Sequence, residues 1–266
     1  MKTTRGMRLR LRLAAAVALT LAIVAGGALP AQADDTWTWS TATHPAGGGS
    51  IGPLGWGTFG GGVYRYHGVD YVPGVGHIDT PLGTWRDEQV TGAGTVGRVA
   101  YTTYANGKPG APDIGLIATG TKPIAPKVRV SEGWQDAWVT DVAHPGDVTA
   151  GKSLCHSGTS PETIAAGGYR CGVVSSACGA ASTSCYVSMG VSGGDSGGPV
   201  WWYSDGGITL YGWISGSFFG STAVFEPVWA LQNHVWTESE SWSSWGYPPG
   251  NDGTGCFVTI SGCVRS

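Results

Sequence analysis

Charged residues are scarce in this sequence, and helical periodicity is nearly absent from it. Only 12% of the 266 residues are charged and leucine is infrequent, which excludes a coiled coil or a long-helix bundle. The hydrophobic share of 41% is too high for a disordered chain. The 46 glycines follow no period, which excludes collagen. What remains is a turn-rich, all-β protein with one large core or two small ones.

No apolar run in the sequence is long enough to span a membrane. The longest, Leu13–Gly26, has about 14 residues, whereas a bilayer needs roughly 20. Basic residues precede this run and Ala31-Gln32-Ala33 follows it. The pattern indicates a secretory signal peptide over residues 1–33, cleaved after Ala33, and a membrane anchor is the alternative. We therefore predict a secreted, extracellular protein.

Basic residues are few outside this first segment. Residues 1–33 hold five of the 15 basic residues and no acidic ones, which leaves 10 basic against 18 acidic residues. The net charge of the remainder is therefore −8, compared with −3 for the whole chain. An acidic protein offers no basic face to nucleic acid or anionic lipid. We expect no nucleic-acid partner and, after signal cleavage, no membrane partner.

Cysteine is absent before Ala33, and six cysteines follow it. An even number outside the cell suggests three disulfides. The sequence does not determine the pairing, but proximity favours Cys155–Cys171, Cys178–Cys185 and Cys256–Cys263. Because no Cys-x-x-Cys pair is present, zinc is a poor alternative, and we predict no metal and no cofactor.

Short apolar runs separated by Gly, Pro and Asn predict β-strands. They are Val63–Tyr66, Val69–Val72, Val96–Tyr104, Ile114–Ala118, Val128–Val130, Ala137–Val142, Gly172–Val174, Pro199–Tyr203, Ile208–Ile214 and Ala223–Val224. Many short strands at this spacing are typical of a sandwich or a barrel. One helix is predicted over Phe225–Trp236, where apolar residues follow helical spacing and Pro227 fits the first turn.

One serine lies among glycines in the run Gly193-Gly194-Asp195-Ser196-Gly197-Gly198-Pro199. Glycines let the backbone approach a substrate closely. A serine nucleophile needs a base, an acid that orients the base, and fixed donors for the oxyanion. A Gly-rich hairpin without chemistry is the alternative. An α/β-hydrolase elbow is disfavoured, because Pro199–Tyr203 reads as a strand where that fold needs a helix.

Residues 194–199 of this run resemble the nucleophile motif of the chymotrypsin-like serine peptidases. Further segments are similar to the secreted bacterial branch of that family, the alpha-lytic protease and streptogrisin group. They are Cys155-His156-Ser157-Gly158, Tyr169-Arg170-Cys171-Gly172 and Gly212-Trp213-Ile214-Ser215-Gly216. The resemblance extends from about residue 96 to residue 235.

The resemblance implies an all-β fold of two antiparallel six-stranded β-barrels with a C-terminal helix. After the signal peptide at 1–33, we predict a lead-in at 34–50 and an N-terminal barrel at 51–122. A C-terminal barrel with the closing helix follows at 123–238, and a Cys-containing tail at 239–266. The stretch 118–127, with two prolines, is the candidate linker between the barrels.

The resemblance also implies a triad in the order His, Asp, Ser, with Ser196 as nucleophile. Asp113, in Pro112-Asp113-Ile114-Gly115, is similar to the family's acid motif and would orient the base. A turn aspartate without a catalytic role is the alternative at this position.

His77 is the candidate base, because Gly76-His77 resembles the family motif. Ile78 stands where the family has a cysteine, so the disulfide beside the base must be missing. His67 and His44 are alternative bases, and a chain without a working histidine is a further alternative. The histidines that follow Asp113 are interpreted as surface residues without a role: His144, His156 and His234.

By the same resemblance, the backbone N–H groups of Gly194 and Ser196 would form the oxyanion hole. Ser215 would support the buried Asp113. The substrate would pair as an added strand with Ile214, Ser215, Gly216 and Ser217. Gly190 stands where a trypsin carries an acid, so no preference for Arg or Lys is expected. Met189 and Ile214 indicate an apolar or small pocket instead.

The sequence thus predicts a secreted, monomeric serine endopeptidase that hydrolyses peptide bonds of protein or peptide substrates through an acyl-enzyme. A catalytically inactive homologue that binds a protein or a glycan is the alternative, motivated by the departures around His77.

Overall fold

The structure of the protein is a computed structural model that describes residues 57–66, 68–79, 81–88, 94–104, 112–120, 125–130, 135–234 and 255–266. All of them lie within one structural unit, Trp37–Ser266. The predicted signal peptide, the lead-in, His44 and His67 fall outside the described residues. No helix within the described ranges is both long enough and apolar enough to cross a membrane.

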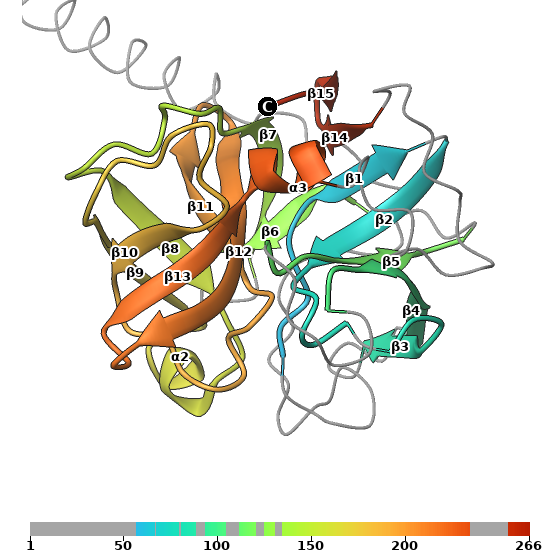
Figure 1. The fold of residues 1–266 in the computed structure, drawn as a ribbon, viewed down its shortest axis with the longest axis horizontal. Helices are drawn as coiled ribbons and strands as arrows, with labels where there is room; N and C mark the ends of the chain where they lie inside the picture. Colours follow the sequence, from blue (N-terminus) through green and yellow to red (C-terminus); the bar gives the residue numbers. More distant parts are fainter. Residues whose placement is uncertain are drawn as a thin grey trace, which may run out of the picture. The chain divides into compact units, whose positions relative to one another are not determined.

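Six strands of the C-terminal half close into a barrel, as expected (Figure 1). Around the barrel their order is β11-β8-β9-β10-β13-β12, and pairing of β11 with β12 closes it. The strands are β8 (Ser153–Ser157), β9 (Tyr169–Val174), β10 (Cys185–Ser188), β11 (Pro199–Ser204), β12 (Gly207–Phe218) and β13 (Thr222–Pro227). Beyond β12 the sheet continues through β7 (Asp136–Val142), which pairs in parallel, and β6 (Lys127–Arg129).

Alternating side chains fill this barrel. On β10, Cys185 and Val187 are buried, whereas Tyr186 and Ser188 point outward, as the two-residue period of a strand requires. Trp201 and other large apolar side chains from β11, β12 and β13 are almost fully buried in the same core. Burial of such aromatic surface is the main stabilising contribution to the barrel.

The N-terminal half forms a seven-stranded sheet in the order β15-β14-β1-β2-β5-β4-β3. Five strands come from the expected N-terminal barrel: β1 (Val63–Tyr66), β2 (Val69–Gly74), β3 (Trp85–Glu88), β4 (Gly94–Thr102) and β5 (Gly115–Ala118). The other two come from the Cys-containing tail, β14 (Cys256–Thr259) and β15 (Gly262–Val264). The tail therefore belongs to the N-terminal sheet, with β14 paired to β1.

The helices differ from the prediction. The C-terminal helix α3 spans Val228–His234, so a start at Phe225 was wrong. β13 continues through Pro227, because Phe225 is buried between its partners on β12 and β10. A second short helix, α2 (Pro161–Ala165), was not predicted. Ser160 caps it by accepting a hydrogen bond from the N–H of Thr163.

The three disulfides join the pairs that proximity favours. Cys155–Cys171 links directly opposed residues of β8 and β9. Cys178–Cys185 closes the loop before β10, and Cys256–Cys263 closes the β14–β15 hairpin.

Candidate active site

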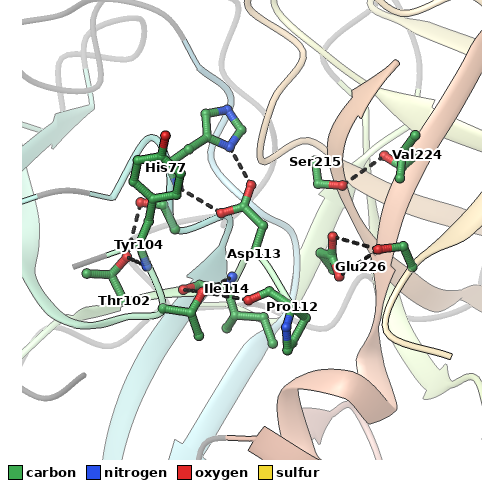
Figure 2. A network of polar contacts seen from close by, with 12 residues as sticks. His77, Thr102, Tyr104, Pro112, Asp113, Ile114, Ser215, Val224 and Glu226 are labelled. Carbon is green, nitrogen blue, oxygen red and sulfur yellow. Dashed lines mark hydrogen bonds and ion pairs between the residues drawn. The ribbon is translucent and has the colours of Figure 1, made fainter. Parts of the chain in front are cut away.

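His77 and Asp113 meet at one end of the N-terminal sheet. β2 and β5 are antiparallel partners, and Gly74 at the end of β2 lies opposite Gly115 at the start of β5. The turn after β2 and the segment before β5 therefore share this end. His77 Nδ1 lies 2.5 Å from Asp113 Oδ2, and the His77 backbone N–H donates to Oδ1 at 2.9 Å (Figure 2).

This double contact gives the imidazole a defined orientation. A carboxylate at Nδ1 favours the tautomer in which Nδ1 carries the proton, which leaves Nε2 able to accept one. Gly76 makes the contact possible. A Cβ at this position would lie 2.7 Å from the Ile114 carbonyl oxygen and 3.1 Å from Asp113 Oδ1. The tyrosine ring of Tyr104 lies edge-on to the imidazole, with ring centroids 6.4 Å apart.

A buried ion pair stands beside His77, where the sequence lacks the family's disulfide. Arg86 Nε lies 3.5 Å from Asp79 Oδ1, and each side chain is only 2% exposed. Arg86 also donates to the Ile78 carbonyl oxygen at 2.6 Å. Burial raises the pKa of Asp79 to about 6, although Arg86 and His77 act in the opposite direction. The guanidinium of Arg86 thus attaches the turn that carries His77 to β3.

The loop that carries Ser196 is anchored through its neighbour Asp195, which is completely buried. Asp195 accepts hydrogen bonds from the Ser160 hydroxyl at 2.9 Å and the Ser160 N–H at 3.0 Å. The Thr163 hydroxyl and the Ser192 N–H donate to the same carboxylate at 2.9 and 3.0 Å. Four donors therefore hold this carboxylate, and two of its partners belong to the start of α2.

Replacing Ser160 with Ala is expected to destabilise the protein. The change removes one donor to the buried Asp195 and the N-cap of α2, and an incompletely paired buried group costs about 1–3 kcal/mol. Urea unfolding followed by tryptophan fluorescence measures this loss. Ser175→Ala is the matched control, because the Ser175 hydroxyl pairs with the Ser188 hydroxyl in an exposed position. Equal unfolding midpoints for the two variants would contradict the role of Ser160.

The N-terminal half also contacts the Ser196 loop directly. The Thr58 N–H donates to the Ser196 carbonyl oxygen at 2.7 Å, and the hydroxyls of Thr58 and Thr159 donate to the Gly194 carbonyl oxygen. A Cβ on Gly197 would lie 2.8 Å from Ile78, the residue after His77. The structure therefore brings the Ser196 and His77 segments together. The Ser196 hydroxyl has no recorded hydrogen bond to described residues, and such bonds are often long without substrate.

The predicted oxyanion donors, Gly194 and Ser196, are partly exposed residues of this loop. Gly194 has φ of 107°, in the region that favours glycine. Asp195 and Gly197 donate their N–H groups to backbone carbonyls. Among the described residues, no acceptor is recorded for the N–H groups of Gly194 and Ser196, which leaves them available to a ligand.

The predicted substrate strand has a free edge. β11 pairs with β12 only as far as Trp213, and β13 covers the other side of β12 to Phe218. Within the described residues, Gly216 and Ser217 are thus paired with β13 on one side only, and Ser215 is the bulge residue between Ile214 and Gly216. An extended peptide can add to such an edge.

The predicted pocket residue Gly190 lies beside two basic side chains. His156 Nε2 lies 3.2 Å from the Gly190 carbonyl oxygen, and a Cβ on Gly190 would meet the Arg170 guanidinium at 2.5 Å. His156 is completely buried, so its interpretation as a surface residue was wrong. Burial lowers the pKa of His156 and favours the neutral ring.

Ser215 and Asp113 are not joined by a recorded hydrogen bond within the described chain. The Ser215 hydroxyl donates to the Val224 carbonyl oxygen at 3.4 Å. The carboxyl of Glu226 lies near both residues (Figure 2), and the sequence analysis did not select it. The sequence feature that could have pointed to Glu226 is its charge, because the rest of the run Ala223–Leu231 is uncharged.

No group of three or more His, Cys, Asp or Glu side chains in the described ranges is arranged to hold a metal ion.

No protein-family model and no curated protein matches this sequence. Solved structures do resemble it. One is a glutamic acid-specific serine protease that uses a histidine triad in substrate binding, with a TM-score of 0.51 and 19% identity over 73% of this chain and 96% of that chain. Chymotrypsin of Cellulomonas bogoriensis has a TM-score of 0.49 and 20% identity over 73% of this chain and 94% of that chain. Protease A of Thermobifida fusca has a TM-score of 0.46 and 21% identity over 65% of this chain and 84% of that chain.

The first likeness shows that this chain has the fold of the chymotrypsin-like serine proteases, as the resemblance of its motifs implies.

Proposed function

We propose that the protein is a secreted serine endopeptidase in which Ser196, His77 and Asp113 form the catalytic triad. The observation that carries this proposal is the contact of both Asp113 oxygens with His77, on a turn that packs against the Ser196 loop. Acyl transfer by serine needs an oriented base of this kind.

The reaction begins when a peptide adds to the free edge of β12 at Ser215–Ser217. Ser196 Oγ attacks the peptide carbonyl carbon, and His77 Nε2 takes the hydroxyl proton. The N–H groups of Gly194 and Ser196 stabilise the oxyanion. His77 then gives its proton to the leaving amine, which produces an acyl-enzyme. Water, activated by His77, attacks the ester and releases Ser196.

The alternative, an inactive homologue that binds a protein or glycan, rests on the missing disulfide beside His77. The buried Asp79–Arg86 pair provides another attachment for that turn. The His77–Asp113 contact therefore favours the active enzyme. Secretion follows from the signal-peptide pattern and agrees with the three disulfides. We further propose that the protein is a monomer and that its substrates are proteins or peptides.

Labelling with a fluorophosphonate probe tests this function. The purified wild-type protein is expected to form a covalent adduct and to cleave casein, and Ser196→Ala is expected to abolish both. Ser192→Ala is the matched control, since this serine lies in the same loop and its recorded contacts with Asp195 are made by backbone groups, which the substitution retains. A folded wild-type protein that stays unlabelled would favour the inactive homologue.

A further inference from the structure

Glu226 is a buried carboxyl near the proposed catalytic aspartate. It lies on β13 opposite Trp213 and is 3% exposed. Phe225 fills the barrel core, so the alternation of the strand turns Glu226 to the face that meets the N-terminal half. The Ser184 hydroxyl approaches both of its carboxylate oxygens, at 3.2 and 3.4 Å. Figure 2 places the Glu226 carboxyl near Asp113 and Ser215.

No ion pair to this carboxyl is found among the described residues. The groups that influence it are Asp113, by its negative charge and its backbone N–H, and the hydroxyls of Ser215 and Ser184. Burial and the Asp113 charge raise the pKa of Glu226 to about 7, against the effect of the hydroxyls and the amide. The carboxyl therefore changes its charge in the pH range in which a histidine base works.

We propose that Glu226 is a positioning residue of the active site, whose carboxyl lies against Ser215 and Asp113 and adds its charge to that of the His77–Asp113 pair. This inference rests on the proposed function, because it assigns Glu226 a role in the proton transfer by His77. Glu226 does not touch the substrate in this role and acts through Asp113.

The charge of Glu226 has a defined effect on His77. When ionised, Glu226 adds a second negative charge behind Asp113 and stabilises the protonated imidazole. When Glu226 is neutral, this contribution disappears. The other charged groups around His77 are Asp113 in direct contact and the Asp79–Arg86 pair behind the turn. None of them changes when Glu226 is replaced, so the effect can be isolated.

The test compares wild type with Glu226→Gln, which preserves the shape of the side chain and removes its charge. The imidazole of His77 is followed by NMR over pH, and the pH profile of kcat/KM is measured on the same samples. In Glu226→Gln, both the titration midpoint of His77 and the acid limb of the profile are expected to move by about half to one pH unit to lower pH. Ser184→Ala is the control, because it removes one hydrogen bond and keeps the charge.

An unchanged His77 midpoint in folded Glu226→Gln would overturn the proposal, as would an equal shift in Ser184→Ala. The NMR titration does not need turnover, so an inactive wild type would overturn the peptidase function and leave this measurement valid. If Glu226→Gln does not fold, the His77 titration curve of the wild-type protein tests the proposal by itself. Two coupled groups give a His77 curve that departs from a single-site titration, and a simple single-site curve would refute the coupling.

Discussion

Asp113→Asn is expected to lower kcat about 10⁴-fold with little change in KM or in folding, the loss that this change causes in other Ser-His-Asp triads. The physical reason lies in the contact of Asp113 Oδ2 with His77 Nδ1 at 2.5 Å. An asparagine that keeps the bond to the His77 backbone N–H through its oxygen presents an amide NH₂ to Nδ1. The imidazole then carries its proton on Nε2, where it cannot accept one from Ser196.

Single-turnover acylation with a chromogenic ester measures this loss without interference from product release. Asp70→Asn is the matched control, because Asp70 also contacts a basic partner, Arg65, in the N-terminal sheet but lies on the β1–β2 hairpin. Asp70→Asn should retain near wild-type acylation. A loss below tenfold in Asp113→Asn would contradict the triad assignment, as would an equal loss in Asp70→Asn.

Arg86→Met is expected to destabilise the protein by about 3–5 kcal/mol at pH 8, because it leaves Asp79 buried without its partner. The pKa of Asp79 is raised to about 6 even with Arg86 present, and removal of the guanidinium raises it further. An acid whose folded pKa exceeds its unfolded value opposes folding at pH values above the unfolded pKa, where the unfolded chain is ionised. The loss should therefore shrink from pH 8 to pH 4, close to the ordinary pKa of 3.8, where Asp79 is protonated in the folded state and the unfolded chain is only partly ionised at this position.

Urea unfolding at the two pH values measures this effect. The double variant Asp79→Asn/Arg86→Met removes both charges and should recover much of the stability at pH 8. The acylation rate of Arg86→Met should also fall at pH 8, since the Ile78 carbonyl loses its bond and the His77 turn loosens. A destabilisation that is independent of pH would argue against a buried charge as its cause, and so would a double variant no more stable than the single one.

Much of the architecture could be predicted because it depends on local patterns. Short apolar runs predicted β1, β7 and β11 nearly to their ends, and the Gly, Pro and Asn residues between the runs marked the boundaries between strands. The start of α3 was wrong for a physical reason. Phe225 and Val228 fit a helical period, but Phe225 also fits the two-residue period of β13, and pairing with two neighbouring strands decides between them.

The site shows the same division between local and distant information. Ser196, Asp113 and His77 stand in short motifs, so the sequence could select them. The partners that hold them come from distant segments: Arg86 from β3, Ser160 from the start of α2 and Glu226 from β13. A single arginine, serine or glutamate carries no motif, and only tertiary packing shows which carboxylate or hydroxyl it meets.

The tail strands have a consequence for self-digestion. A peptidase that binds extended peptides by edge pairing can also bind an exposed edge strand of another copy of itself. β1 would present such an edge, but β14 pairs along it from Arg65 to Val63. The edge strand on this side of the sheet is therefore β15, which has only three residues and is joined to β14 by the Cys256–Cys263 disulfide. For the proposed endopeptidase, the hairpin thus leaves only this short, cross-linked strand as the edge that a neighbouring copy could pair with on that side of the sheet that carries His77.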